Sequence, residues 1–248
     1  MNPVFESNYE LRYFEMNKNG MASPTTMLTL LEETAAEHCL SIGHSLYSLE
    51  KQNIGWVLAS GIVEMIRYPG YKENITIKTW LSSYTLVRGY RENIILDSEE
   101  NIIGRAKGLW VFYDIKKRKP LPIFDDIRLK WGRKEESSVE KNLGLVNQSE
   151  DGPFRTEFNV YNSDVDSNEH VNNIRYLHYL MESLPEDFME RYHLKVLNAK
   201  FIAEARLGEK IKVYVNEDMG DNNLFHTMKN SSGDTVLAKA HTQWEEIS

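Results

Sequence analysis

Residues 23–43 read S-P-T-T-M-L-T-L-L-E-E-T-A-A-E-H-C-L-S-I-G, and this stretch decides the fold class. Ser23 can cap a helix, and Pro24 is tolerated at the first helical position. Apolar side chains then recur at helical spacing, namely Met27, Leu28, Leu31, Ala35 and Cys39. Gly43 can close the helix. The pattern therefore predicts one long helix over residues 24–42.

Strand patterns follow this helix in an uninterrupted series. We predict strands at residues 56–67, 74–81, 89–96 and 102–113. In the second of them Ile75, Ile77 and Thr79 alternate with more polar neighbours, which is the period of a strand with one buried face. A helix followed by consecutive strands favours an antiparallel α+β unit over an alternating βαβ fold.

The second half of the chain repeats this order. A strand at 154–161 precedes helical spacing at Val171, Ile174, Leu177 and Met181, a short helix at 186–192, and strands at 195–205, 210–216, 224–229 and 235–244. An offset of 149 residues, from Asn17 to Asp166, also brings Leu28 onto Leu177. A helix wrapped by a curved antiparallel sheet is the hot-dog arrangement. We therefore predict two tandem hot-dog units, at residues 1–133 and 153–248, joined by a polar linker at 134–152.

Composition excludes several classes of protein. The 248 residues are 41% hydrophobic and 27% charged, as in ordinary globular chains. The net charge of −8 argues against nucleic acid as a partner, because phosphate binding needs a basic surplus. Cys39 is the only cysteine, so no intramolecular disulfide can form. Since no signal peptide and no apolar stretch of about 20 residues is present, we expect a cytoplasmic protein without a membrane span.

Polar residues are densest at residues 162–173, N-S-D-V-D-S-N-E-H-V-N-N, just before the second predicted helix. Asp, Asn and Ser start helices, so capping alone explains part of this stretch. His170 and Asn173, three residues apart, are predicted on one face of the helix N-terminus, where free N–H groups can stabilise an oxyanion. The same offset places Met21 where the second half has His170. A histidine-dependent reaction is therefore predicted for the second half alone.

Residues 166–173, D-S-N-E-H-V-N-N, with Tyr176 and Glu182, resemble the active-site signature of the plant-type acyl-ACP thioesterases and their bacterial relatives, where ACP is acyl carrier protein. Residues 80–83 and 105–111 resemble strands of that family's first domain, and 201–205, F-I-A-E-A, the strand that carries its catalytic glutamate. The resemblance implies release of fatty acid from acyl-ACP, without cofactor or metal. It implies a site made of Asp166, Asn168, His170 and Glu204.

One position departs from the family pattern. Plant-type members often have a cysteine directly after the glutamate, whereas this chain has Ala205. Cys39 lies at an apolar position of the first helix, where a small buried hydrophobe is expected. A cysteine nucleophile is therefore disfavoured for this chain.

The residues permit more than one mechanism. Our hypothesis makes Glu204 the general base for water, with His170, while Asn168 polarises the carbonyl and Asp166 holds the loop. A second assignment makes His170 the base and Glu204 the group that orients it. Direct attack by the carboxylate, giving an anhydride, is a third route.

Other functions share this pattern in part. An acyl-CoA thioesterase performs the same chemistry on another carrier, and a hydratase also uses an Asp–His pair. A non-catalytic acyl-binding protein needs none of the four site residues. An acidic carrier needs a local basic patch, for which we consider residues 116–119 with Arg88, Arg91, Arg105 and Lys107. Both a monomer and a homodimer fit, because a tandem hot-dog already resembles the usual hot-dog dimer.

Overall fold

The computed structural model describes residues 3–141, 151–166, 170–218 and 222–247. The chain divides into two compact units. The first unit comprises residues 1–59 and 63–141, and the second unit comprises residues 60–62 and 142–248.

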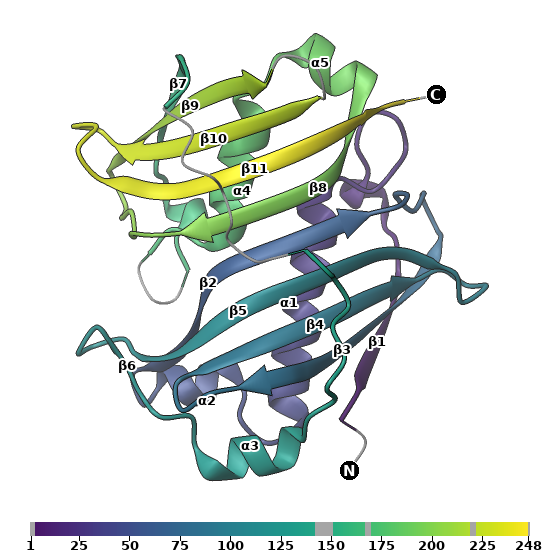
Figure 1. The fold of residues 1–248 in the computed structure, drawn as a ribbon, viewed down its shortest axis with the longest axis vertical. Coiled ribbons are helices and arrows are strands. Elements are labelled where there is room, and N and C mark those ends of the chain that lie inside the picture. The colour runs from purple at the N-terminus through teal and green to yellow at the C-terminus, as the bar shows by residue number, and fades with distance from the viewer. Residues whose placement is uncertain (1–2, 142–150, 167–169, 219–221, 248) are drawn as a thin grey trace. The chain divides into compact units, whose positions relative to one another are not determined.

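The first unit combines one long helix with an antiparallel sheet (Figure 1). Its strands lie in the order β1-β3-β4-β5-β2, and the short β6 pairs with β5. In chain order the elements are β1 (Phe5–Glu10), the 3-10 helix η1 (Tyr13–Glu15), α1 (Pro24–Ser41), α2 (Leu46–Glu50), β2 (Ile54–Met65), β3 (Asn74–Tyr84), β4 (Arg88–Leu96), β5 (Ile102–Asp114), β6 (Lys119–Pro120) and α3 (Asp125–Trp131).

Helix α1 forms where its sequence signals predict. The Ser23 hydroxyl accepts a hydrogen bond from the Thr26 N–H at 3.0 Å, and Pro24 occupies the first turn. The helix ends at Ser41, and Gly43 has the positive φ of 85° that favours glycine. One face of α1 buries side chains among those of the sheet in a common core cluster, which includes Met27, Leu30, Leu31, Ile75, Ile77, Ile95 and Ile103.

The second unit has the same strand order, β7-β9-β10-β11-β8. Its elements are β7 (Phe154–Asn159), η2 (Asn162–Asp164), α4 (Asn173–Glu182), α5 (Glu186–Arg191), β8 (Tyr192–Phe201), β9 (Lys210–Asp218), β10 (Asn223–Asn230) and β11 (Val236–Glu246). β7, η2 and the start of α4 follow β1, η1 and the start of α1 at the predicted offset of 149 residues. The predicted repeat is therefore confirmed.

The structure corrects the sequence prediction at the start of α4. Val171 was expected inside the helix, and His170 on its N-terminal face. Instead, the Asn172 side chain caps the helix by accepting the Ile174 N–H at 2.8 Å, so α4 begins only at Asn173. Val171 forms a β-bridge with Val165. His170 therefore lies before the helix, and its position depends on the loop.

Residues 134–139, which we call the strap, pack on the first unit although they belong to the predicted linker. The Trp80 indole N–H donates to the backbone oxygen of Glu136 at 2.9 Å, and Val139 is only 2% exposed. The fully buried Glu92 carboxylate accepts hydrogen bonds from the Ser138 N–H and hydroxyl, at 2.9 and 2.8 Å. The strap therefore packs against the face of the sheet that carries Trp80 and Glu92. Residues 142–150 of the linker lie outside the described residues.

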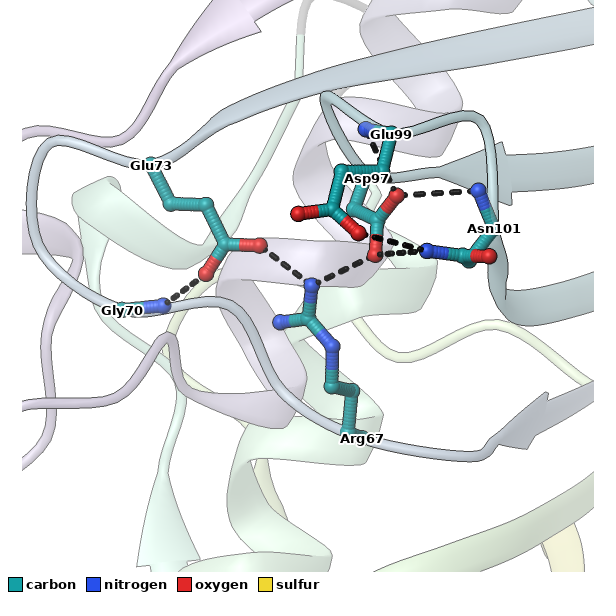
Figure 2. A network of polar contacts seen from close by, with 6 residues as sticks. All are labelled: Arg67, Gly70, Glu73, Asp97, Glu99 and Asn101. Atoms are coloured by element: carbon teal, nitrogen blue, oxygen red, sulfur yellow. Dashed lines mark hydrogen bonds and ion pairs between the residues drawn. The ribbon is translucent and has the colours of Figure 1, made fainter.

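Figure 2 shows a polar network that ties together two loops of the first unit. Arg67 Nη2 donates to Glu73 Oε1 at 2.5 Å and to Asp97 Oδ2 at 3.0 Å. Glu73 also accepts the Gly70 N–H, and Asp97 the Asn101 N–H, at 3.0 and 2.9 Å. The hydrogen bond from Arg67 lowers the pKa of Glu73. One guanidinium thus joins the β2–β3 connection to the β4–β5 turn.

Two buried histidines are expected to make the fold acid-sensitive. Burial lowers the pKa of His38 in the first unit and of His226 in the second to about 3. The unfolded chain binds these protons near pH 6.5, whereas the folded chain stays unprotonated until about pH 3. As pH falls from 6.5 to 5, the free energy of unfolding should therefore fall, by a slope that rises toward about 1.4 kcal/mol per pH unit for each histidine.

Urea unfolding at pH 6.5 and 5 measures this dependence. His226→Gln should reduce the pH slope by the contribution of one proton. Thr242→Val is the matched control, because it removes the hydroxyl that lies 2.8 Å from His226 Nε2 and no titratable group. It should lower stability at both pH values and keep the wild-type slope. An unchanged slope in His226→Gln would contradict the assignment.

Within the described residues, no helix is both long enough and apolar enough to cross a membrane.

Candidate active site

The centre of the candidate site is an imidazole–carboxylate pair in the second unit. His170 Nε2 lies 3.2 Å from Glu204 Oε2. The His170 side chain is 20% exposed and that of Glu204 33% exposed, so water can reach both. The two residues are 34 positions apart in the sequence and come from separate loops, one before α4 and one after β8.

Backbone hydrogen bonds hold these two loops together. We call the described residues 160–166 and 170–172 the histidine loop, and residues 202–209 the glutamate loop. The Val171 N–H, next to His170, donates to the oxygen of Ala205, next to Glu204, at 3.0 Å. At the other end of the glutamate loop, the Val160 N–H donates to the Glu209 oxygen at 2.9 Å. The His170–Glu204 pair is therefore set by main-chain geometry on both sides.

The histidine loop is also closed on itself. The Asp166 N–H donates to the His170 oxygen at 2.9 Å, and the Asn172 N–H to the Asp164 oxygen at 3.0 Å. Asp166 thus takes part in this loop through its main chain, and the predicted role of its side chain stays a prediction. The predicted site residue Asn168 lies outside the described residues.

The first unit contains the same loop without the chemistry. Its Asn17 N–H donates to the Met21 oxygen at 2.7 Å, and its Ser23 N–H to the Glu15 oxygen at 3.2 Å, each 149 residues before its counterpart. Met21 therefore occupies the place of His170, as the sequence predicted. The Ala22 N–H donates to the Pro69 oxygen, as the Val171 N–H donates to the Ala205 oxygen. Tyr68, the residue before Pro69, therefore occupies the place of Glu204, the residue before Ala205. The first unit thus lacks both members of the pair.

Two residues of this region were not predicted as site residues. Asp164, 7% exposed, accepts the Tyr161 N–H at 2.8 Å, with Arg175 Nε at 3.6 Å from its carboxylate. Tyr176, 2% exposed, accepts the Ala205 N–H at 2.8 Å, and burial raises the pKa of its hydroxyl. Asp164 matches Glu15 at the offset of 149, and that signal was available in the sequence. The contact between Tyr176 and Ala205 could not be predicted from the sequence, because it joins residues 29 positions apart.

Two expectations about the first unit have different outcomes. Cys39 is 4% exposed in an apolar cluster, and burial raises the pKa of its thiol, so it is the buried hydrophobe we predicted. Arg91, assigned to a basic surface patch, is instead 5% exposed and donates to Thr79 Oγ1 at 3.1 Å. Lys107 bonds Ser137 at 2.9 Å and lies 3.3 Å from Glu92. The patch prediction was wrong for Arg91, because alternation along β4 turns this side chain inward.

Among the residues that the structure describes, no three His, Cys, Asp or Glu side chains come together as metal ligands. The pair His170–Glu204 is instead suited to proton transfer.

Comparison with known proteins identifies the family. The model of the acyl-ACP thioesterase N-terminal domain matches residues 2–131, and that of the acyl-ACP thioesterase C-terminal domain matches residues 147–246. The chain belongs to the acyl-ACP thioesterase family. The predicted family and enzyme class, a hydrolase of acyl-carrier thioesters, are therefore confirmed.

Individual relatives agree with this assignment. The chloroplastic oleoyl-acyl carrier protein thioesterase of Coriandrum sativum is 23% identical over 253 residues, which cover 94% of this chain and 68% of that one. The solved 12:0-ACP thioesterase from Umbellularia californica superposes with a TM-score of 0.86 at 20% identity, over 100% of this chain and 99% of that one. An acyl-ACP thioesterase from Bacteroides thetaiotaomicron gives 0.85 at 20% identity, over 98% of each chain. The likeness to these structures confirms the predicted fold class.

Proposed function

We propose that this chain hydrolyses the thioester of acyl-ACP to free fatty acid and carrier thiol, and that His170 and Glu204 carry the reaction. The observation that supports this most directly is the 3.2 Å contact between His170 Nε2 and Glu204 Oε2. It occurs in the unit that has kept the histidine, within a chain of the acyl-ACP thioesterase family.

The geometry favours Glu204 as the general base. In this assignment the Glu204 carboxylate is the acceptor and His170 Nε2–H the donor across their 3.2 Å contact. This contact orients Glu204, whose carboxylate would take the proton from water. If His170 were the base, its Nδ1 would have to take that proton. The first assignment needs no rearrangement of the pair.

In the proposed reaction one proton of the attacking water passes through the pair to the leaving sulfur. Water attacks the thioester carbonyl carbon while its proton passes to Glu204, and the carbonyl oxygen becomes an oxyanion. Asn168, in the role that the family resemblance implies, stabilises that oxyanion. Collapse of the intermediate breaks the C–S bond, and the sulfur takes the proton back through the His170–Glu204 pair. The products are a fatty acid and the carrier thiol.

Two further expectations concern where the enzyme acts and how it binds its acidic carrier. We propose a cytoplasmic enzyme, active as a monomer or a homodimer, that docks acyl carrier protein through local basic residues.

Thiol release from a panel of acyl-ACPs and the matching acyl-CoAs tests the function. We expect faster hydrolysis of acyl-ACP at equal concentrations of the two substrates. Activity on acyl-CoA alone would keep the mechanism and replace the carrier. Hydrolysis of neither carrier by a folded wild-type protein would overturn the proposed function.

A further inference from the structure

The residue after Glu204 is fixed on both sides by hydrogen bonds. The Ala205 N–H donates to the Tyr176 hydroxyl at 2.8 Å, and the Ala205 oxygen accepts the Val171 N–H at 3.0 Å. Ala205 is fully buried, so water cannot replace either partner. The Val171 bond links the glutamate loop to the histidine loop. The Tyr176 bond links it to helix α4.

Tyr176 contacts the chain on the other side of Glu204 as well. Its ring lies against that of Phe201, with 6.0 Å between the ring centroids. Phe201 is the last residue of β8, three positions before Glu204. The Tyr176 side chain, 2% exposed, thus touches the main chain that follows Glu204 and the side chain that precedes it.

The first unit shows what the loops look like without this interaction. There the Ala22 N–H bonds to the Pro69 oxygen at 2.8 Å, as Val171 does to Ala205. Proline has no N–H to donate. Met27, 149 residues before Tyr176, has no hydroxyl to accept one. The paired loops therefore form without the tyrosine–amide bond, which is present in the unit that carries His170 and Glu204.

We propose that Tyr176 is a positioning residue, which holds Glu204 at hydrogen-bonding distance from His170. This inference rests on the proposed function, since it concerns the geometry of the same pair. Its physical basis is that a catalytic group displaced by about 1 Å can lose about 10²-fold in rate. Without the hydroxyl, the glutamate loop keeps only the Val171 bond at this point.

Tyr176→Phe removes the hydroxyl and keeps the ring against Phe201. Tyr179→Phe is the matched control on the same helix, because it removes a buried hydroxyl that interacts with Asp164 and not with Ala205. We expect kcat on acyl-ACP to fall about tenfold or more in Tyr176→Phe, with KM unchanged. Tyr179→Phe should keep the wild-type kcat.

A double-mutant cycle separates positioning from general stability. If Tyr176 acts through Glu204, Tyr176→Phe will lower kcat in the wild type and cause no further loss in the Glu204→Gln background. Equal losses in both backgrounds would overturn the inference, as would an unchanged kcat in the single variant.

An NMR measurement decides the inference without using activity. The ring ¹⁵N signals of His170, assigned by their absence in His170→Ala, report its contact with Glu204. In Tyr176→Phe they should move toward their values in Glu204→Gln, and in Tyr179→Phe they should not. Wild-type signals in a folded Tyr176→Phe would overturn the inference. If the wild type hydrolyses no acyl thioester, the proposed function fails, while these signals still show whether Tyr176 positions the pair.

Discussion

Replacing His170 with alanine is expected to lower kcat on acyl-ACP by about 10²–10⁴-fold, the range for loss of a general acid–base group. His170 is the partner of Glu204 at 3.2 Å, and no second histidine stands at the equivalent place in the first unit. Glu204→Ala should cause a loss of similar size. Because the two side chains act as a pair, the double variant should lose little more than either single variant.

The control for this prediction is His178→Ala. His178 lies on α4, is partly exposed and makes no ion pair with a described residue. Its removal should leave kcat within about twofold of wild type and change the free energy of unfolding by about 0.5 kcal/mol or less. A wild-type rate in His170→Ala, with the fold intact by circular dichroism, would exclude the pair as the catalytic centre.

Replacing Glu92 with alanine is expected to cost about 3–5 kcal/mol of unfolding free energy, the range for removing one partner of a buried ion pair. Its carboxylate is fully buried and gathers several donors: Ser82 Oγ at 2.7 Å, Ser138 N–H at 2.9 Å, Ser138 Oγ at 2.8 Å and Lys107 Nζ at 3.3 Å. Alanine would take this acceptor away from the Ser138 N–H and the Ser82 hydroxyl, and the attractive charge away from Lys107. The strap would then lose its main attachment to the sheet.

Urea unfolding of the wild type and two variants measures this effect. Glu136→Ala is the matched control in the same strap, because the Glu136 side chain is 61% exposed and Trp80 bonds to its backbone oxygen. It should change stability by less than about 0.5 kcal/mol. Equal stabilities of the Glu92 and Glu136 variants would show that the strap contributes little to the first unit.

Local signals explain why much of the fold was predictable. The Ser23 cap, Pro24 and the apolar spacing from Met27 act within a few residues, and α1 ends within one residue of its predicted end. The strands of both sheets alternate clearly enough to be placed within a few residues. β1 and the short helices α2 and α3 were missed, because β1 exists through its pairing with β3 and short helices carry little periodicity.

The candidate site was predictable only in part. The loop of His170 and the glutamate at 204 stand out by resemblance to a family, and the repeat explains why Met21 cannot replace the histidine. The sequence wrongly extended α4 back to His170, since helical spacing at Val171 competes with its bridge to Val165. A local pattern cannot show that competition, because the bridge also needs the rest of the loop.

Local patterns and the family resemblance were thus enough to predict the two α+β units, the start of α1 and the candidate residues His170 and Glu204 in the second unit. The three-dimensional structure was needed to show that these two side chains lie 3.2 Å apart, that Tyr176 bonds to Ala205 and that Glu92 anchors the strap. The difference lies in how far apart in the sequence the interacting residues are. Capping and periodicity act over a few neighbouring residues, whereas these contacts join residues 34, 29 and 46 positions apart.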